Sequence, residues 1–211
     1  MKELVLNTDK FLLESIQEKK NANLLNRFRA SHEQIKITKH FKKLAKKEEA
    51  EGSARTFVVK VNSGNEDSNF LVMAFTIKLN PIPYVSESGR KEHSDFISAL
   101  QITYLATNET IVNMIKNSVN LTTSIGTYIY STVIEPLLYH IANLIGNTDI
   151  VYLYAVNSIV KKIYENWGFT ELRRTDDLNL VNKKIRKQEE NGCIFMFKKL
   201  DPKMLNPDFN S

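Results

Sequence analysis

The sequence predicts an α+β fold in which helices cover a mixed sheet. Apolar residues recur at helical spacing in the first fifty positions and again in residues 124–146. Residues 55–61, 70–79 and 99–107 instead alternate or are continuously apolar, as β-strands are. Patterns of both kinds follow one another along a single chain of 211 residues. We therefore expect one core built from both kinds of element.

The composition is that of a globular protein with a small excess of positive charge. Hydrophobic residues make up 42% of the chain, and no apolar run approaches the roughly 20 residues that cross a membrane. The net charge of +5 fits an anionic partner without requiring one. The N-terminal residues carry no export signal, and Cys193 is the sole cysteine, so no internal disulfide can form. We expect a cytoplasmic protein with no membrane partner.

The first fifty residues are expected to form helices that pack on the same core as the rest. Residues 9–28 have loosely helical apolar spacing, and Ser31 to Gln34 has the pattern of a capping box. A second helix follows, and its expected apolar stripe is Ile35, Phe41, Leu44 and Ala45. The predicted divisions are helices at 1–50, a main domain at 51–200 and a C-terminal tail at 201–211.

The main domain is expected to begin with an antiparallel hairpin. Its strands lie at 57–61 and 70–79, and the second is apolar on both faces and so buried on both sides. Residues 80–95, with two prolines, are expected to form a loop before the strand at 99–107. A connection that can hold a short helical turn follows.

A long helix comes next and is expected to end at Gly146. Pro136 lacks a backbone N–H, so it should kink or bend this helix. The apolar face of the helix carries Ile129, Val133, Leu137, Ile141 and Leu144. The remaining predicted elements are a buried strand at 151–156, a short helix up to Trp167, a charged segment at 173–190 and a last strand at 193–200.

The buried strand leads into an informative spacing. Tyr164 stands seven residues after Asn157 and four before Gly168, which an aromatic residue follows. This pattern, with the preceding strand, loop and long helix, resembles the GNAT superfamily of N-acetyltransferases over roughly residues 55–170. The resemblance implies a mixed, mostly antiparallel twisted sheet flanked by helices. It also implies direct attack of an amine on the thioester of acetyl-coenzyme A.

By this resemblance, Tyr164 faces the sulfur of acetyl-coenzyme A and protonates the departing thiolate. Asn157 matches the family's Asn at the strand end, and Gly168-Phe169 matches the turn into the next strand. A phenol held on a rigid helix can supply a proton to a leaving thiolate. The alternative is that Tyr164 is an ordinary half-buried helix aromatic with its hydroxyl at the surface.

The start of the long helix resembles the family's pyrophosphate loop, (Arg/Gln)-x-x-Gly-x-(Gly/Ala), in part. Such a loop binds phosphate through the free N–H groups and positive dipole end of a helix. Gly126 is kept, but Leu121 replaces the Arg or Gln and Ser124 replaces the first glycine. The resemblance implies coenzyme contacts from Thr122, Thr123, Ser124, Ile125, Gly126 and Thr127. Helix capping alone would explain Thr123 and Ser124 equally well.

Leu105 and Thr107 match the family positions whose main-chain groups pair with the pantetheine arm. One N–H there polarises the thioester carbonyl, and such a donor stabilises the transition state by about 2.7 to 4 kcal/mol. The alternative is an ordinary sheet ladder.

The sequence leaves the acceptor amine open. Basic residues cluster at Lys39, Lys42, Lys43, Lys46 and Lys47 and again at Lys183, Lys184, Arg186 and Lys187. The stretch Phe41–Ala45, then acids, then Ser53–Val59 resembles the toxin-like GNAT branch, some of whose members acetylate aminoacyl-tRNA. Charged tRNA bound through the basic helices, a protein amine and a small-molecule amine are therefore all open. Solvated helix faces would also explain the lysines. A homodimer is compatible with the sequence.

Other chemistries find little support in the sequence. The four histidines and Cys193 have no metal-ligand spacing, so no metal is expected, and neither a G-x-S-x-G elbow nor a Walker loop occurs. Glu92, His93 and Glu109 are candidates for the base that takes the amine proton, and a water chain is another.

Two rivals to the acetyltransferase remain. One is a non-catalytic GNAT-fold binding or regulatory protein with a degenerate coenzyme loop, which Leu121 and Ser124 favour. The other is a nucleic-acid binder that uses the lysine-rich helices. The spacing of Asn157, Tyr164 and Gly168 favours the enzyme.

Overall fold

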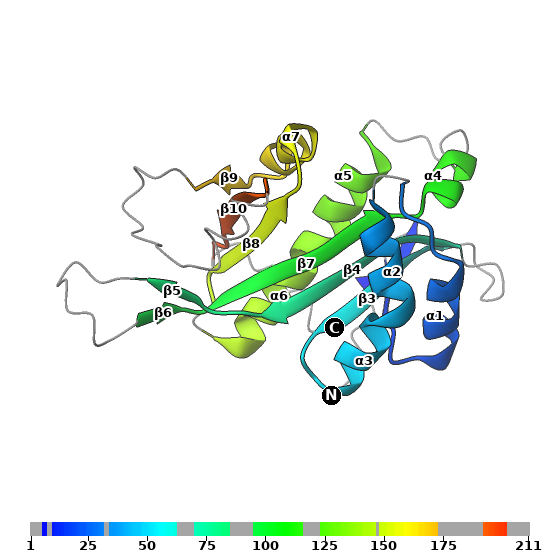
Figure 1. The fold of residues 1–211 in the computed structure, drawn as a ribbon, viewed down its shortest axis with the longest axis horizontal. Coiled ribbons are helices and arrows are strands. Elements are labelled where there is room, and N and C mark those ends of the chain that lie inside the picture. Colours follow the sequence, from blue (N-terminus) through cyan, green and yellow to red (C-terminus); the bar gives the residue numbers. More distant parts are fainter. Residues whose placement is uncertain are drawn as a thin grey trace. The chain divides into compact units, whose positions relative to one another are not determined.

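The structure is a computed structural model, and it describes residues 6–7, 10–31, 34–62, 70–84, 95–115, 123–146, 148–172 and 192–201. Helices flank a mostly antiparallel sheet, which confirms the predicted α+β class (Figure 1). No helix within these ranges is long and apolar enough to cross a membrane.

The chain divides into two compact units. The first comprises Met1–Lys78 and Ile102–Glu135, and the second comprises Leu79–Gln101 and Pro136–Ser211. The units interleave along the sequence, so this division does not test the boundaries predicted at residues 50 and 200, which stay a prediction.

The first unit contains a sheet with the strand order β1-β2-β3-β4-β7. Its strands are β1 (Leu6–Asn7), β2 (Phe11–Ser15), β3 (Arg55–Val61), β4 (Leu71–Leu79) and β7 (Ala99–Thr107), which enters the unit at Ile102. The predicted hairpin is confirmed, since β3 pairs antiparallel with β4, with Thr56 opposite Thr76. Residues 71–77 of β4 are all buried, as expected for a strand covered on both faces.

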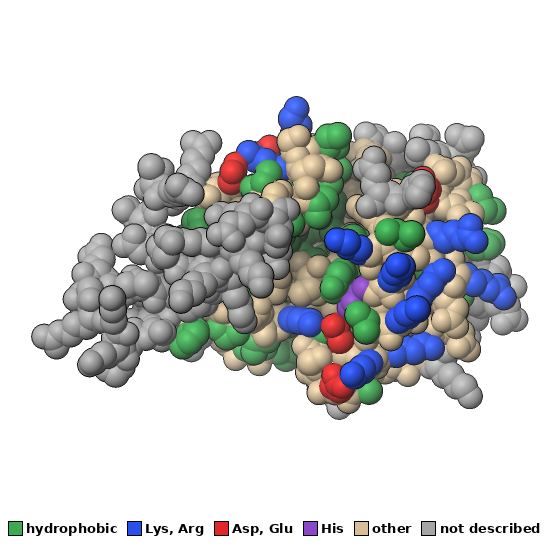
Figure 2. All heavy atoms as spheres, viewed as in Figure 1, with side chains coloured by type: hydrophobic (Ala, Val, Ile, Leu, Met, Phe, Trp, Pro, Cys, Tyr) green, Lys and Arg blue, Asp and Glu red, His purple; other side chains and the backbone are tan. Residues whose placement is uncertain are grey.

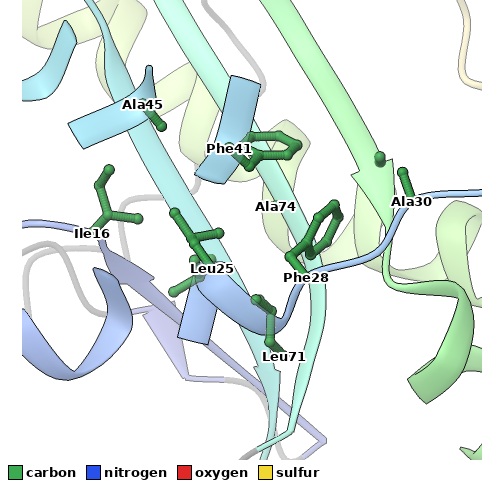
Figure 3. Packing of buried hydrophobic residues seen from close by; sticks show 10 residues of the cluster. Ile16, Leu25, Phe28, Ala30, Phe41, Ala45, Leu71 and Ala74 are labelled. Atoms are coloured by element: carbon green, nitrogen blue, oxygen red, sulfur yellow. The ribbon is translucent and has the colours of Figure 1, made fainter. Parts of the chain in front are cut away.

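Short helices cover one face of β3 and β4 (Figure 1). They are α1 (Lys19–Leu24), the 3-10 turn η1 (Leu25–Arg27), α2 (Ile35–Lys43) and α3 (Ala45–Ala50). Buried residues from these helices and from the strands form one cluster (Figure 3). The rings of Phe28 and Phe41 meet edge to face, with centroids 5.1 Å apart. Apolar packing thus attaches α2 to the sheet.

The helix predicted over residues 9–28 is wrong at its start, because Phe11–Ser15 forms β2. Phe11 and Leu13 are fully buried and lie opposite Val61 and Val59 of β3. Phe11 and Leu13 are two residues apart and point to the same face, as in a strand, and the backbone pairing with β3 stabilises this conformation. Only tertiary contacts supply that pairing.

The capping box predicted at Ser31 does not form. Gln34 is the N-cap of α2 with no side-chain cap, and its N–H donates to the backbone carbonyl of Ser31 at 2.8 Å. The predicted apolar stripe is also partly wrong, since Ile35 and Leu44 are 55% and 48% exposed. Leu44 separates two helices, so a single stripe cannot continue across it.

The predicted long helix begins in the first unit. It consists of α5 (Ile125–Ile129), a π-helix (Tyr130–Ile134) and α6 (Glu135–Ile145), and it ends at Gly146 in the left-handed conformation, φ 70°. The π-helix ends two residues before Pro136, whose missing N–H cannot join an α-helical ladder. The predicted short helical turn is α4 (Glu109–Ile115).

The second unit contains the strand order β7-β8-β10-β9. Its strands are the start of β7, β8 (Ile150–Ala155), β9 (Thr170–Glu171) and β10 (Ile194–Lys199), with α7 (Ser158–Asn166) between β8 and β9. β8 runs parallel to β7 and antiparallel to β10. Tyr152 stacks on Phe195 with ring centroids 5.2 Å apart, in a core shared with Ala99 and Ile150.

Three details of the second unit differ from the predictions. The loop expected at 80–95 contains β5 (Ile82–Tyr84), and its last residue begins β6 (Asp95–Ile97), which pairs with β5. Leu144, expected on the apolar face, is 70% exposed at the end of α6. Cys193, the first residue of the predicted last strand, lies half-buried just before β10. The charged segment at 173–190 and residues 202–211 of the tail lie outside the described residues.

Candidate active site

The structure places Leu105 and Thr107 near the end of β7, both half-buried. Tyr104 and Ala106 pack with the cluster under α2, so the alternating side chains of Leu105 and Thr107 leave the sheet on the opposite face. The N–H of Asn108 donates to Val72 of β4 at 2.6 Å, which holds the end of β7 to its neighbour.

Ser124 is the N-cap of α5. Its Oγ accepts from the N–H of Thr127 at 3.2 Å and donates to Thr127 Oγ1 at 2.9 Å. The capping alternative for Ser124 is therefore realised. Beside it, a Cβ added at Gly126 would meet nothing within 4 Å, so the first turn of the helix is open there. Thr123 is exposed, whereas Thr122 and Leu121 lie outside the described residues.

In the second unit, Asn157 is the N-cap of α7. Its Oδ1 accepts from the N–H of Val160 at 2.9 Å, and its exposed amide NH₂ group has no hydrogen bond within the described residues. The first turn of α7 is thus fixed by a side chain whose other polar group remains available to a ligand.

The other end of α7 is a Schellman motif. The N–H of Phe169 donates to the carbonyl of Tyr164 and that of Gly168 to the carbonyl of Glu165, both at 3.0 Å. Gly168 has φ 84°, which favours glycine, and a Cβ there would lie 3.2 Å from Lys198 Nζ. Asn157, Gly168 and Phe169 are therefore the start and stop signals of one short helix.

Tyr164 lies on α7 two turns after Asn157, and hence on the same side of the helix. Its half-buried ring packs against Trp167 and Phe169, with centroids 5.2 and 6.2 Å away. Its hydroxyl forms no hydrogen bond within the described residues. Burial raises the pKa of Tyr164 to about 12, so the phenol is protonated at neutral pH. The second unit thus holds a phenol that can donate a hydrogen bond.

The sequence interpretation missed the contacts of Lys161, which connect α7 to β9. Lys161 hydrogen-bonds to Glu171 of β9 and lies 3.6 Å from Glu165. The i,i+4 spacing of Lys161 and Glu165 was visible in the sequence, but the contact with Glu171 needed the turn at Gly168.

Of the predicted bases, only Glu109 falls in the described part of the chain. It is exposed at the first position of α4, and its backbone N–H donates to the backbone carbonyl of Arg29 at 2.9 Å. Glu92 and His93 lie outside the described residues. Within the described ranges, no group of three or more His, Cys, Asp or Glu side chains could hold a metal ion.

A basic surface covers α2 and α3 in the first unit (Figure 2). Lys39, Lys43, Lys46 and Lys47 are exposed and Lys42 is half-buried. The described residues 34–47 contain no acidic residue. The second predicted basic cluster, at 183–187, lies outside the described residues.

No family model and no curated protein sequence matches this chain. Solved structures match it over most of its length. AtaTR bound with acetyl-coenzyme A has a TM-score of 0.62 at 12% identity and covers 96% of this chain and 100% of its own. A tyrosine-to-phenylalanine variant of the AtaT toxin, bound to the C-terminus of the antitoxin AtaR and acetyl-coenzyme A, has a TM-score of 0.59 at 11% identity over 96% and 100%.

A third match is AtaT complexed with acetyl-methionyl-tRNAfMet, with a TM-score of 0.55 at 12% identity over 88% of this chain and 93% of its own. At such low sequence identity these matches show the fold alone. The fold resemblance predicted from the Asn157 to Phe169 spacing is confirmed. The chain has the GNAT-like fold of the AtaT toxin.

Proposed function

We propose that this protein is an N-acetyltransferase that transfers the acetyl group of acetyl-coenzyme A to an amine. The observation that carries the proposal is the state of Tyr164. Its ring is fixed against Trp167, and its protonated hydroxyl has no partner in the described part of the chain. A donor held in this way is suited to the negative charge that develops on a leaving sulfur.

In the proposed reaction, the neutral amine attacks the thioester carbon directly, without a covalent enzyme intermediate. The backbone N–H of Leu105 donates to the carbonyl oxygen as it gains charge. The carbon–sulfur bond then breaks, and Tyr164 donates to the sulfur. The amine releases its extra proton to Glu109, to one of the loop candidates Glu92 and His93, or to water.

Residues at the starts of α5 and α7 and on β7 supply the proposed coenzyme contacts. The free N–H groups at the start of α5 would receive the pyrophosphate, and the open side of Gly126 lets it approach the backbone. Thr122, Thr123, Ser124, Ile125 and Thr127 complete this loop in the proposal. Thr107 would pair with the pantetheine arm through its main chain, and the free amide NH₂ of Asn157 would donate to the coenzyme.

For the acceptor, we propose the amino group of a charged tRNA. The basic surface of α2 and α3 supports this class, because clustered exposed lysines favour contact with phosphates, although Lys47 also pairs with Glu51 at 3.7 Å. The matched complex of AtaT with acetyl-methionyl-tRNAfMet supports it at the level of a shared fold. A protein or small-molecule amine is the alternative acceptor.

One observation favours a second candidate, a non-catalytic binding protein. The Ser124 hydroxyl is engaged in the helix cap, and Leu121 offers no polar group to a pyrophosphate. In that case the partner would be a protein, for which the matched AtaT toxin bound to the C-terminus of the antitoxin AtaR is the precedent.

The deciding experiment has two stages. Calorimetric titration with acetyl-coenzyme A tests the coenzyme site, and we expect saturable heat. Transfer of labelled acetyl groups is then measured with charged tRNA, uncharged tRNA and free amino acids. Labelling of charged tRNA alone supports the whole proposal. Coenzyme binding without transfer to any amine would favour the second candidate, and no heat at millimolar acetyl-coenzyme A would refute the enzyme.

A further inference from the structure

We propose that Tyr104 contacts the acceptor amine and that His40 positions it, an inference that rests on the proposed acetyltransferase function. Both residues lie in the first unit, Tyr104 on β7 and His40 on α2. His40 is buried and has no part in the reaction proposed above.

The ring of Tyr104 is held in place by α2. It stacks on the imidazole of His40 with centroids 3.6 Å apart and planes 15° apart, and it meets Phe41 edge to face at 6.4 Å. Its hydroxyl forms no hydrogen bond within the described residues and is not among their buried unsatisfied atoms. The phenol is therefore fixed in orientation and still open to a ligand.

His40 is 2% exposed, and polar groups surround one of its ring nitrogens. Nε2 lies 3.3 Å from Thr76 Oγ1, which in turn lies 2.9 Å from Thr56 Oγ1. Nδ1 has no hydrogen-bond partner within the described residues. An unpaired buried nitrogen destabilises a fold, so the proposed contribution of His40 comes from its ring rather than from Nδ1.

A carboxylate completes the cluster. Glu48 Oε2 lies 3.9 Å from His40 Nε2, and Glu48 Oε1 lies 3.4 Å from Lys78 Nζ. Burial and the charge of Glu48 raise the pKa of Tyr104, so its hydroxyl stays a neutral phenol. A neutral phenol oxygen can accept a hydrogen bond from the N–H of the neutral attacking amine.

The place of Tyr104 in the strand connects it to the reaction. It directly precedes Leu105, whose N–H is the proposed donor to the thioester carbonyl. Tyr104 lies on the face covered by α2, whereas α5 packs on the other face, where Tyr128 meets Phe11 with centroids 5.8 Å apart. With the coenzyme bound from the α5 side, the proposal has the amine approach from the side of Tyr104.

The test compares Tyr104→Phe with Tyr139→Phe. The control loses the same hydroxyl from α6, where it accepts from the N–H of Asp201. Tyr104→Phe should raise the KM for charged tRNA by about three- to tenfold, as expected for one lost hydrogen bond. The kcat and the calorimetric Kd for acetyl-coenzyme A should stay the same, because the lost contact binds only the acceptor. Tyr139→Phe should change none of these values.

Two variants of His40 separate positioning from general stability. His40→Phe keeps a ring to stack on Tyr104, and His40→Gln keeps a hydrogen bond to Thr76 but no ring. We expect the KM for charged tRNA to rise in the Gln variant and to stay near the wild-type value in the Phe variant.

An unchanged KM in folded Tyr104→Phe would overturn the role of Tyr104, and equal KM values in the two His40 variants would overturn that of His40. Either result leaves the proposed function intact if the wild-type protein acetylates tRNA. A wild-type protein without transfer would refute both proposals.

Discussion

The ring of Tyr164 lies 5.2 Å from the ring of Trp167, tilted by 51°, while its carbonyl accepts hydrogen bonds from Trp167 and Phe169. The aromatic ring and the backbone of Tyr164 thus hold the end of α7, and its hydroxyl takes no part in this packing. A substitution can therefore remove the hydroxyl and leave the local structure in place.

Tyr164→Phe should fold normally and bind acetyl-coenzyme A as the wild type does. Loss of a positioned acid lowers turnover by about 10²- to 10⁴-fold, and the loss should appear in kcat because the contact matters only as the sulfur gains charge. Thermal melting, calorimetry and acetyl transfer are the three measurements. Equal rates in a folded, coenzyme-binding variant would leave Tyr164 as a packing residue.

Gly126→Asp should abolish detectable binding of acetyl-coenzyme A. Because the space at Gly126 is open, repulsion between the carboxylate and the phosphates, rather than bulk, is the expected cause. Gly126→Ala is the matched control and should bind within about twofold of the wild type, because its methyl group meets no neighbour. Similar calorimetric affinities for the two variants would place the pyrophosphate elsewhere.

Replacing Lys42, Lys43, Lys46 and Lys47 with Ala should weaken binding to charged tRNA and flatten its salt dependence. Each lost phosphate contact reduces the slope of log K against log salt by about 0.7 to 0.9. Lys162 and Lys199, both exposed in the second unit, serve as a charge-loss control. An unchanged slope of log K against log salt in the fourfold variant would mean that these lysines do not contact the tRNA.

Lys60→Met should destabilise the first unit. Lys60 and Glu14 are 2% and 8% exposed, their charged atoms are 2.6 Å apart, and Asn21 donates to the same carboxylate at 2.7 Å. Removing one partner of such a buried pair costs about 3 to 5 kcal/mol. Lys47→Met, at the exposed pair with Glu51, should change the unfolding free energy by less than about 0.5 kcal/mol in urea titrations. Equal losses would mean that the buried pair contributes nothing specific.

Stability should fall as the pH is lowered from 6.5 to about 4, and His40 should carry much of the effect. Burial lowers the pKa of His40 from 6.5 to about 4, despite the opposing charge of Glu48. In this window the unfolded chain binds a proton that the folded protein does not, so the slope approaches about 1.4 kcal/mol per pH unit. His40→Gln should remove this component from urea titrations at pH 7, 5.5 and 4.5. The same slope in the variant would contradict the assignment.

Protonation of Glu14 should cause a further loss of stability at lower pH. Burial by itself raises the pKa of Glu14, but the hydrogen bonds from Lys60 and Asn21 and the charge of Lys60 hold it below its ordinary value of 4.5. An acid whose pKa is lowered by folding stabilises the fold at pH values above its unfolded pKa. This contribution is lost as the pH falls below 4.5 toward the pKa of the folded state. Glu14→Gln should therefore flatten the unfolding free energy between pH 4.5 and 3 relative to the wild type. An identical profile in the two proteins would count against the contribution of Glu14.

Local signals were enough to predict much of this fold. The strand at 99–107 and the helix that Asn157 and Gly168 delimit are both present as predicted. Continuous apolar runs, an N-capping side chain and a glycine in the left-handed conformation act within a few residues of chain, so the sequence displays them directly. The fold class and the resemblance to GNAT proteins followed from the order of such elements.

Only the tertiary structure decided the features that depend on distant partners. Phe11–Ser15 became a strand because β3 pairs with it, and Leu44 was left exposed because α2 and α3 separate there. His40 and Tyr104 stack although they are far apart in the sequence, which shows neither the contact nor the unpaired nitrogen beside it. The sequence by itself determined which segments form helices and strands where local periodicity is strong, since that preference is a property of neighbouring residues. Burial and side-chain partners were decided by packing, because they depend on surfaces that meet only after the chain has folded.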